Sequence, residues 1–447
     1  MSEDSERSFD EKEYRIILGA GTKEALLAAK RAFGAFGFRA NFNMIADRTI
    51  SLEYPQGDGF LPVRTLHHAR HIGAFLDGAR TQLPALHSVM TSSAYGVSGH
   101  IDRAGSSLTS SQLVFEMLRA VGGGDRFRAA GLAMELASRG KTELLMETLR
   151  DEGSRRYAYA PSPLLVLNAV LCALLGREIT ESAARISACA VTDHGISADA
   201  LNARRALRHA DVSIDRAAEN DHFTDNVADT RVTAAIRSGI PEMALQVIAD
   251  ELRKGVSARH ILNTVCIEAL LGSAASAKKS TYEFAVQNSS SLLEWTASRG
   301  LTKAADIIEM MAIASHLSQI YSPGGADNDA RSVSSTCSFK EAVSFFENGN
   351  PRELISSVSP ESSGADIERI SKYVAGLSVN CDQAGLYSEA MCHCSSSILS
   401  GVSLESRTGQ AYALRECLSY LSALKIRGAE CRDTVDSIIR TGSKTPE

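Results

Sequence analysis

The stretch that decides the fold is LLVLNAVLCALLG (Leu164–Gly176), because it returns in altered form as RHILNTVCIEALLG (Arg259–Gly272). Each copy is an apolar run with one internal asparagine, Asn168 in the first and Asn263 in the second. A run of this length, rich in leucine and alanine and closed by glycine, is typical of a buried helix. Its recurrence indicates a repeating helical unit.

The sequence between the copies predicts the form of that unit. In DTRVTAAIRSGIPEMALQVIADELRKGVSARHILN (Asp229–Asn263), we expect a first helix to end near Ser238 and Gly239 to make a turn. Pro241 then stands in the first turn of a second helix, where its missing N–H group costs little. Gly255 is expected to end the second helix. The unit is therefore predicted to be a helical hairpin.

Polar residues near the start of the first helices recur at two spacings. Asn168 and Asn202 lie 34 positions apart, as do Asp229 and Asn263, and the steps from Asn202 to Asp229 and from Asn263 to Ser290 are both 27. Repetition at about 20 to 50 residues is typical of a solenoid, in which hairpins bury their apolar faces against neighbours. An alanine 15 positions after four of these residues predicts a close approach of helices: Ala183, Ala217, Ala244 and Ala305, whereas Asn263 is followed by Ala277 and Lys278.

The predicted fold is all-α, a solenoid of helical hairpins with a small N-terminal αβ or irregular region. In that region EYRIIL (residues 13–18) and RTISLEY (residues 48–54) are expected to be strands, and residues 22–37 an amphipathic helix. The predicted domains are an N-terminal region with an acidic tail, a helical-repeat array, a linker, and C-terminal helical repeats with a polar tail, at residues 1–60, 61–320, 321–338 and 339–447.

Composition limits the classes of function. The 447 residues are 44% hydrophobic and carry a formal net charge of −6, so a nucleic-acid partner would need a local basic face. No apolar run reaches the roughly 20 residues of a membrane span. Nine dispersed cysteines are typical of reduced thiols inside a cell. The acidic start is unlike a secretory signal or a mitochondrial presequence, so we expect either a cytosolic protein or a start that is not the primary translation product.

The hairpins resemble the pentatricopeptide repeat family and its degenerate relatives. The resemblance rests on GIPEMALQVIADELRKGVSARHILNTV (Gly239–Val265) and LNAVLCALLGREITESAARISACAVTDHGISADALN (Leu167–Asn202), and covers about residues 130–311. It implies a right-handed solenoid that binds single-stranded RNA or serves as a scaffold in RNA-processing and ribonucleoprotein assemblies. The resemblance also implies a mitochondrial location. Without it, the expected location is cytoplasmic.

Members of that family read bases through pairs of residues on successive repeats. The resemblance places these pairs at Leu164 with Ala169, Ala198 with Ala203, Asn226 with Thr230, and Arg259 with Thr264. Only Asn226 with Thr230 has the hydrogen-bonding groups of a base-reading pair. This departure favours a scaffold, or RNA binding by shape and charge.

Charge binding would use the arginines of one predicted first helix, Arg204, Arg205 and Arg208, together with Arg259 near another hairpin. Guanidinium groups pair with phosphates and stack on bases. Several acidic residues follow closely along the chain, so a mixed, solvated face is the alternative.

Metal chemistry is suggested by His67 and His71, which are four positions apart and would share a helix face, with His68, His87 and His100 nearby. The glutamate of a His-Glu-x-x-His motif is absent, and a solvated or hydrogen-bonded helix face is the ordinary interpretation. CHC (Cys392–Cys394) and GAG (Gly19–Gly21) are interpreted as buried cysteines and a helix N-cap loop.

From these observations we predict a non-catalytic component of an RNA-processing or ribonucleoprotein assembly, with no cofactor, no membrane association and no small-molecule substrate. Its expected partners are other proteins of a multi-subunit complex, and RNA is a further candidate partner. The alternatives are a pure protein–protein scaffold and a metal-dependent enzyme that uses residues 67–100.

Overall fold

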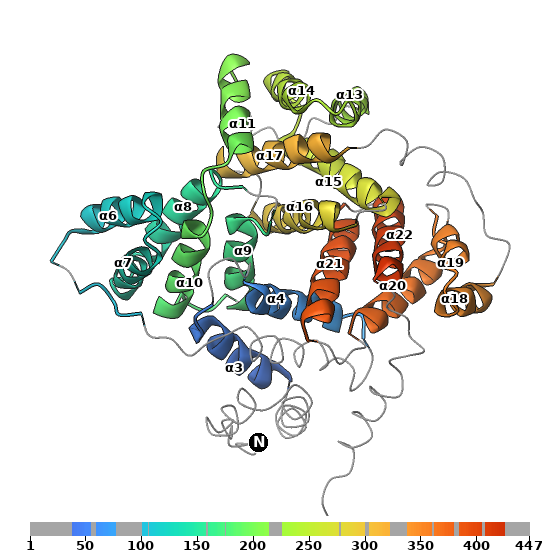
Figure 1. Ribbon diagram of the computed structural model, residues 1–447, viewed down its shortest axis with the longest axis horizontal. Coiled ribbons are helices and arrows are strands. Elements are labelled where there is room, and N and C mark those ends of the chain that lie inside the picture. Colours follow the sequence, from blue (N-terminus) through green and yellow to red (C-terminus); the bar gives the residue numbers. More distant parts are fainter. Residues whose placement is uncertain are drawn as a thin grey trace, which may run out of the picture.

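The computed structural model shows helices throughout the part of the chain that it describes (Figure 1). The described residues are 38–54, 60–76, 101–105, 107–157, 160–174, 176–213, 226–276, 279–299, 304–321, 338–359, 362–379, 384–404 and 407–424. Within these ranges no β-sheet forms, which confirms the all-α class. No helix within these ranges combines the length and apolar content that a bilayer crossing requires.

The helices follow one another with short connections through most of the chain. The first part contains α3 (Phe38–Ser51), α4 (Leu61–Gly73), α6 (Ser110–Gly122), α7 (Arg126–Ser138), α8 (Thr142–Gly153), α9 (Pro163–Ala173), α10 (Glu181–Thr192) and α11 (Ala198–His209). The second part contains α13 (Asn226–Arg237), α14 (Pro241–Arg253), α15 (Ala258–Ala275), α16 (Lys279–Arg299), α17 (Ala304–Ile320), α18 (Phe339–Glu347), α19 (Arg352–Ser356), α20 (Gly364–Val379), α21 (Ala384–Ser403) and α22 (Arg407–Ala423).

The hairpin predicted from the sequence is confirmed at α13 and α14. Pro241 occupies the first turn of α14, and Gly239 and Gly255 have positive φ angles of 73° and 93° at the turn and after the second helix. Glycine adopts such angles without the steric cost that a Cβ atom brings. Local signals therefore set both ends of this unit.

The two copies of the opening motif differ in structure at their glycines. Gly176 follows α9 with φ 79°, in a conformation that favours glycine. Gly272 instead lies inside α15, where a Cβ atom would stand 2.2 Å from Cε1 of Tyr282. Glycine therefore follows the helix in the first copy, and in the second copy it allows close packing within the helix.

The repeat register fails after α15. The unit that begins at Asn263 already departs from the alanine spacing, and only three residues separate Ala275 of α15 from Lys279 of α16. Ser290 consequently lies in the helix that directly follows α15. Three of the predicted alanines, Ala183, Ala244 and Ala305, are buried as expected, whereas Ala217 lies outside the described residues.

The predicted strand at residues 48–54 is wrong, because Arg48–Ser51 form the last turn of α3. Phe42, Ile45, Ala46, Thr49 and Ile50 are all buried, and their spacing of three, four, seven and eight is that of one helix face. The αβ region is therefore not seen in residues 38–54. The expected strand at 13–18 and helix at 22–37 lie outside the described residues.

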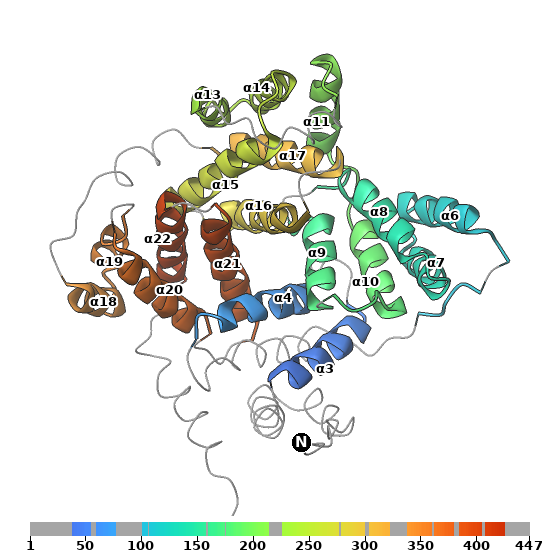
Figure 2. The same cartoon turned by 180° about the vertical axis from the view of Figure 1, so that it is seen from behind.

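Four helices form a closed frame at the centre (Figures 1 and 2). Helices α4 and α16 lie on opposite sides, and α9 and α21 each pack against both of them. Helix α4 thereby contacts the C-terminal part of the chain, where Thr65 Oγ1 lies 3.8 Å from Cys392 Sγ. In an open solenoid each hairpin contacts only its neighbours. The solenoid is thus not confirmed, since the chain closes on itself.

Two clusters of buried apolar side chains follow this closure. One joins residues from 42–191 with residues from 342–421, and the other is built mainly from residues 157–317. Paired helices project from this body at its rim, including α6 with α7 and α18 with α19 (Figure 1).

Candidate functional site

A cluster of two histidines and a glutamate spans the central frame. Helix α4 begins after Phe60, with Pro62 in its first turn, and buries residues on all of its faces. His67 and His71 lie one turn apart on this helix, so both rings point to one side. Their ring centroids are 5.0 Å apart in an edge-to-face arrangement.

Glu294 of α16 completes the cluster. Its Oε2 atom lies 3.0 Å from His67 Nε2, and its Oε1 atom lies 3.0 Å from His71 Nε2. The three side chains offer donor atoms that all lie within 4.8 Å of one another. The side chain of His67 is 4% exposed, whereas that of Glu294 is 24% exposed. Solvent therefore reaches the cluster from the side of His71 and Glu294.

The charges of the cluster follow from its geometry. Burial lowers the pKa of His67, but the charges of Glu294 and Cys172 and their hydrogen bonds outweigh burial and raise it to about 10. Burial raises the pKa of Glu294, yet the two histidines hold it far below its usual range. Burial lowers the pKa of His71. The resting cluster is therefore a His67–Glu294 ion pair beside a neutral His71.

His68 does not belong to this cluster, because its ring faces α21. Its Nδ1 lies 3.1 Å from Ser395 Oγ, and its Nε2 lies 3.4 Å from Ser396 Oγ. Burial, followed by the charges of His67 and His71, holds the pKa of His68 well below its usual value. His67 and His68 are thus buried and His71 is partly exposed, where a solvated or hydrogen-bonded face is the expectation from the sequence.

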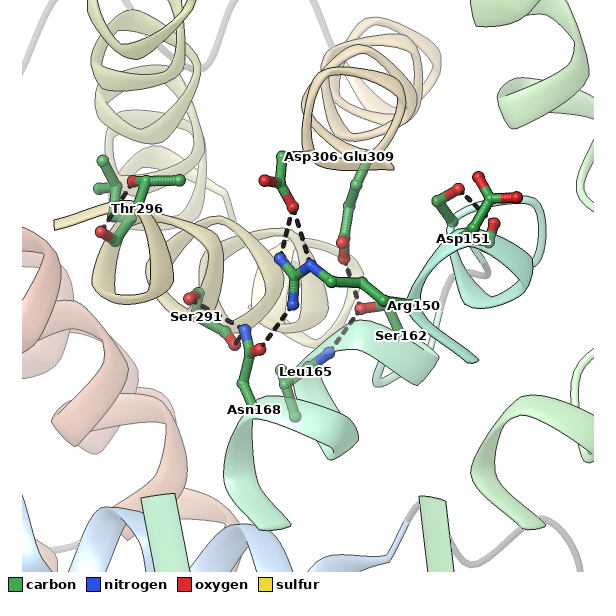
Figure 3. Close-up of polar contacts among 11 residues, drawn as sticks. Arg150, Asp151, Ser162, Leu165, Asn168, Ser291, Thr296, Asp306 and Glu309 are labelled. Atoms are coloured by element: carbon green, nitrogen blue, oxygen red, sulfur yellow. Dashed lines mark hydrogen bonds and ion pairs between the residues drawn. The ribbon is translucent and has the colours of Figure 1, made fainter. Parts of the chain in front are cut away.

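A second polar cluster lies around Arg150 of α8 (Figure 3). The Arg150 guanidinium donates to Asp306 of α17 and, over 3.0 Å, to Asn168 Oδ1 of α9. It also stacks on Trp295, with 3.7 Å between the guanidinium carbon and the ring centroid. All the hydrogen-bonding side chains are buried. This network joins α8, α9, α16 and α17, and it holds Trp295, the residue after Glu294.

Glu309 borders this network from α17 and is buried. The hydroxyl of Ser162, which caps α9 through the N–H group of Leu165, donates to Glu309 Oε1 (Figure 3). Burial raises the pKa of Glu309 to about 7. The Arg150 network and Glu309 have no sequence signal of their own, because their members come from four separate helices.

The predicted basic residues of α11 lie at the rim. Arg205 and Arg208 are exposed, and Arg204 Nη2 lies 3.7 Å from Asp151 Oδ1. Burial, followed by the nearby charge of Arg155, lowers the pKa of Arg204. Arg155 also pairs with Asp151, at 3.2 Å. This α8–α11 basic face, defined here by Arg155, Arg204, Arg205 and Arg208, is therefore mixed with acidic groups.

The predicted base-reading residues do not share one environment. Thr230 is exposed on α13, the backbone of Asn226 begins that helix, and Arg259 is half-buried at the start of α15. Thr264 is buried, and its hydroxyl donates to Asp229. Asp229 also lies 2.9 Å from His260 Nε2. The Thr264 hydroxyl is thus directed into the protein.

The remaining sequence features are structural or lie outside the described residues. Cys392 and Cys394 are buried, and burial raises the pKa of the Cys392 thiol to about 12. His393 between them pairs with the buried Glu416. His87, His100 and the GAG loop at residues 19–21 lie outside the described part of the chain.

Comparison with known proteins gives no further assignment: no protein-family model, no curated protein and no solved structure matches this chain.

Proposed function

We propose that this protein is a non-catalytic helical scaffold that docks a partner protein within a multi-subunit assembly. One observation carries the proposal: two large aromatic side chains project from the α6–α7 hairpin at the rim of the molecule. Phe115 is 66% exposed and Phe127 is 62% exposed. Both are far more exposed than phenylalanine side chains in a core.

The sequence of the hairpin explains why these rings point outward. Helix α6 buries Leu113, Met117, Ala120 and Val121, which lie on one face, and Phe115 lies on another. Glu116 and Arg128, the residues after the two phenylalanines, join α6 to α7 through an ion pair of 2.5 Å. Aromatic side chains beside a polar pair are the usual composition of a protein-binding patch. The two exposed rings and the ion pair beside them therefore support the α6–α7 hairpin as the docking surface.

The proposal is tested with the intact protein. Proteins that co-purify under native salt are cross-linked, the cross-linked residues are mapped, and the partner is then purified and its affinity is measured. We expect cross-links on α6 and α7, and a loss of affinity of at least about tenfold in the Phe115→Ala/Phe127→Ala variant.

The matched control is Phe345→Ala, which removes a ring exposed on α18 at a different part of the rim. This variant is expected to bind the partner with unchanged affinity. Equal binding by the wild type and the double variant would exclude α6–α7 as the docking surface.

A second candidate, RNA binding by charge, is supported by the α8–α11 basic face. One of its four arginines follows the end of α8, and the other three lie on α11. Guanidinium groups recognise phosphates and stack on bases. The likeness to pentatricopeptide repeats supports the same role. Fluorescence anisotropy with single-stranded RNA at low salt tests this second candidate. The Arg205→Glu/Arg208→Glu variant is expected to lose RNA binding. A wild-type protein that binds no RNA would reject the candidate.

A further inference from the structure

We propose that His67, His71 and Glu294 form a site for one Zn²⁺ ion, held between α4 and α16 with a coordination position left open to solvent. The site goes beyond the scaffold function and does not depend on it. Both imidazoles present Nε2 to the same carboxylate, and each Nε2 lies 3.0 Å from one of its oxygens.

The donor set is one that zinc binds. Two imidazole nitrogens and one carboxylate oxygen bind zinc at about 2.0 to 2.2 Å in sites where water occupies the fourth position. In tetrahedral geometry, bonds of this length separate donor atoms by about 3.3 Å. Each nitrogen here lies 3.0 Å from a different oxygen of Glu294, and one donor atom from each residue falls within 4.8 Å of the others, so an ion would draw the three side chains together.

Rigid elements hold all three side chains. His67 and His71 lie on a helix whose residues 61–69 are all buried, and Glu294 lies on a helix of 21 residues. A hydrogen bond of 2.7 Å between Arg64 Nη1 and Gln287 Oε1 ties the same two helices together. Ligands on packed helices keep their geometry better than ligands on loops.

Neighbouring groups contact the ligands and the helices that carry them. Cys172 of α9 interacts with the His67 side chain, and His68 is held by the serines of α21. The residue after Glu294 is Trp295, which is covered by the Arg150 guanidinium. Such second contacts orient metal ligands and strengthen binding.

Solvent access gives the ion a route to the site. Glu294 is 24% exposed and His71 is 21% exposed, whereas His67 closes the inner side. A metal ion can therefore enter from the side of His71 and keep a water molecule as its fourth ligand. A site of this kind fastens α4 to α16.

The test measures Zn²⁺ binding to the full-length protein after treatment with a chelator. Competition against a chromogenic chelator gives the affinity, metal analysis after dialysis gives the stoichiometry, and the absorption spectrum of the Co²⁺-substituted protein gives the coordination geometry. We expect one Zn²⁺ per chain, a tetrahedral Co²⁺ spectrum, and a melting temperature that rises with zinc concentration.

Variants separate a metal site from a simple ion pair. His71→Gln removes one ligand but leaves the His67–Glu294 pair intact, and we expect it to weaken zinc binding by at least about 100-fold. Glu294→Gln is expected to do the same, with circular dichroism showing that each variant is folded. The matched control is His260→Gln, because His260 also pairs with a carboxylate, Asp229, at 2.9 Å but without a second histidine.

The proposal is overturned if the wild type binds no stoichiometric zinc, or if His71→Gln binds zinc as tightly as the wild type does. In either case Glu294 would only form an ion pair with His67, with the neutral His71 beside it.

Discussion

The side-chain amide of Asn168 donates to Ser291 Oγ over 2.9 Å, which ties α9 to α16 in the interior of the protein. Its Oδ1 atom accepts a hydrogen bond of 3.0 Å from Arg150. The asparagine that marks the first copy of the sequence motif is therefore a junction between helices.

Replacing Asn168 is expected to destabilise the protein. Asn168→Ala leaves a guanidinium N–H group of Arg150 and the hydroxyl of Ser291 without this partner in the interior, at a cost of about 1 to 3 kcal/mol. Urea unfolding measures the free energy of unfolding. Asn202→Ala, at the corresponding sequence position on the peripheral α11, serves as the control and should change it by no more than about 0.5 kcal/mol. Equal effects of the two substitutions would contradict the junction.

Arg150→Leu is expected to cost more, about 3 to 5 kcal/mol, because it leaves the carboxylate of Asp306 buried without its main cation. The measurement is again chemical unfolding. Arg155→Leu provides the comparison, since Arg155 is 42% exposed and pairs with acidic residues at the surface. Its effect should stay below about 1 kcal/mol. If Arg150→Leu also lowered the free energy of unfolding by less than about 1 kcal/mol, water would have to reach the Arg150 network.

The buried carboxyl of Glu309 predicts a pH dependence of stability. Its pKa is about 7 in the folded protein and 4.5 ordinarily, so the folded state binds the proton more tightly. The associated stabilisation is complete below pH 4.5 and is lost as the pH rises through 7.

Glu309→Gln removes this dependence, because the amide stays neutral and keeps an oxygen that accepts from Ser162. The variant should be more stable than the wild type at pH 8, by up to about 3 kcal/mol, with little difference near pH 4.5. Thermal and urea unfolding across this range measures the effect. A difference that does not change with pH would show that Glu309 is ionised throughout.

Two glycines inside helices predict opposite responses to alanine. Gly272→Ala places a methyl group 2.2 Å from the ring of the buried Tyr282 and should destabilise the protein by about 1 to 3 kcal/mol. Gly376→Ala meets nothing within 4 Å in α20 and should stabilise it by about 0.5 to 1 kcal/mol, through helix propensity. Melting temperatures of both variants provide the measurement, and stabilisation by Gly272→Ala would show that Tyr282 moves freely.

The sequence predicts those features that depend on neighbouring residues. The α13–α14 hairpin follows from Gly239, Pro241 and Gly255, each of which acts within one turn of its own position. Ile50, Leu52 and Tyr54 alternate as in a strand, so the sequence wrongly predicts a strand at the end of α3. The helical spacing that runs from Phe42 to Ile50 prevails, since it buries a longer face.

The candidate metal site could be predicted only in part. The spacing of His67 and His71 places two ligands on one helix face, and this is visible in the sequence. Glu294 stands more than 200 residues further along the chain, and no local pattern connects it to α4. Its role depends on the packing of α4 and α16 against α9 and α21, which is a property of the whole fold.

The contact between α4 and α21 has a consequence for synthesis on the ribosome. His68 and Ser395, which meet across it, are separated by 327 positions in the chain. At about 5 to 20 residues per second, roughly 15 to 65 s pass between the appearance of the two. During that interval Thr65 and His68 of α4 lack the α21 side chains that they contact in the folded protein. The central frame can therefore close only after α21 has been made.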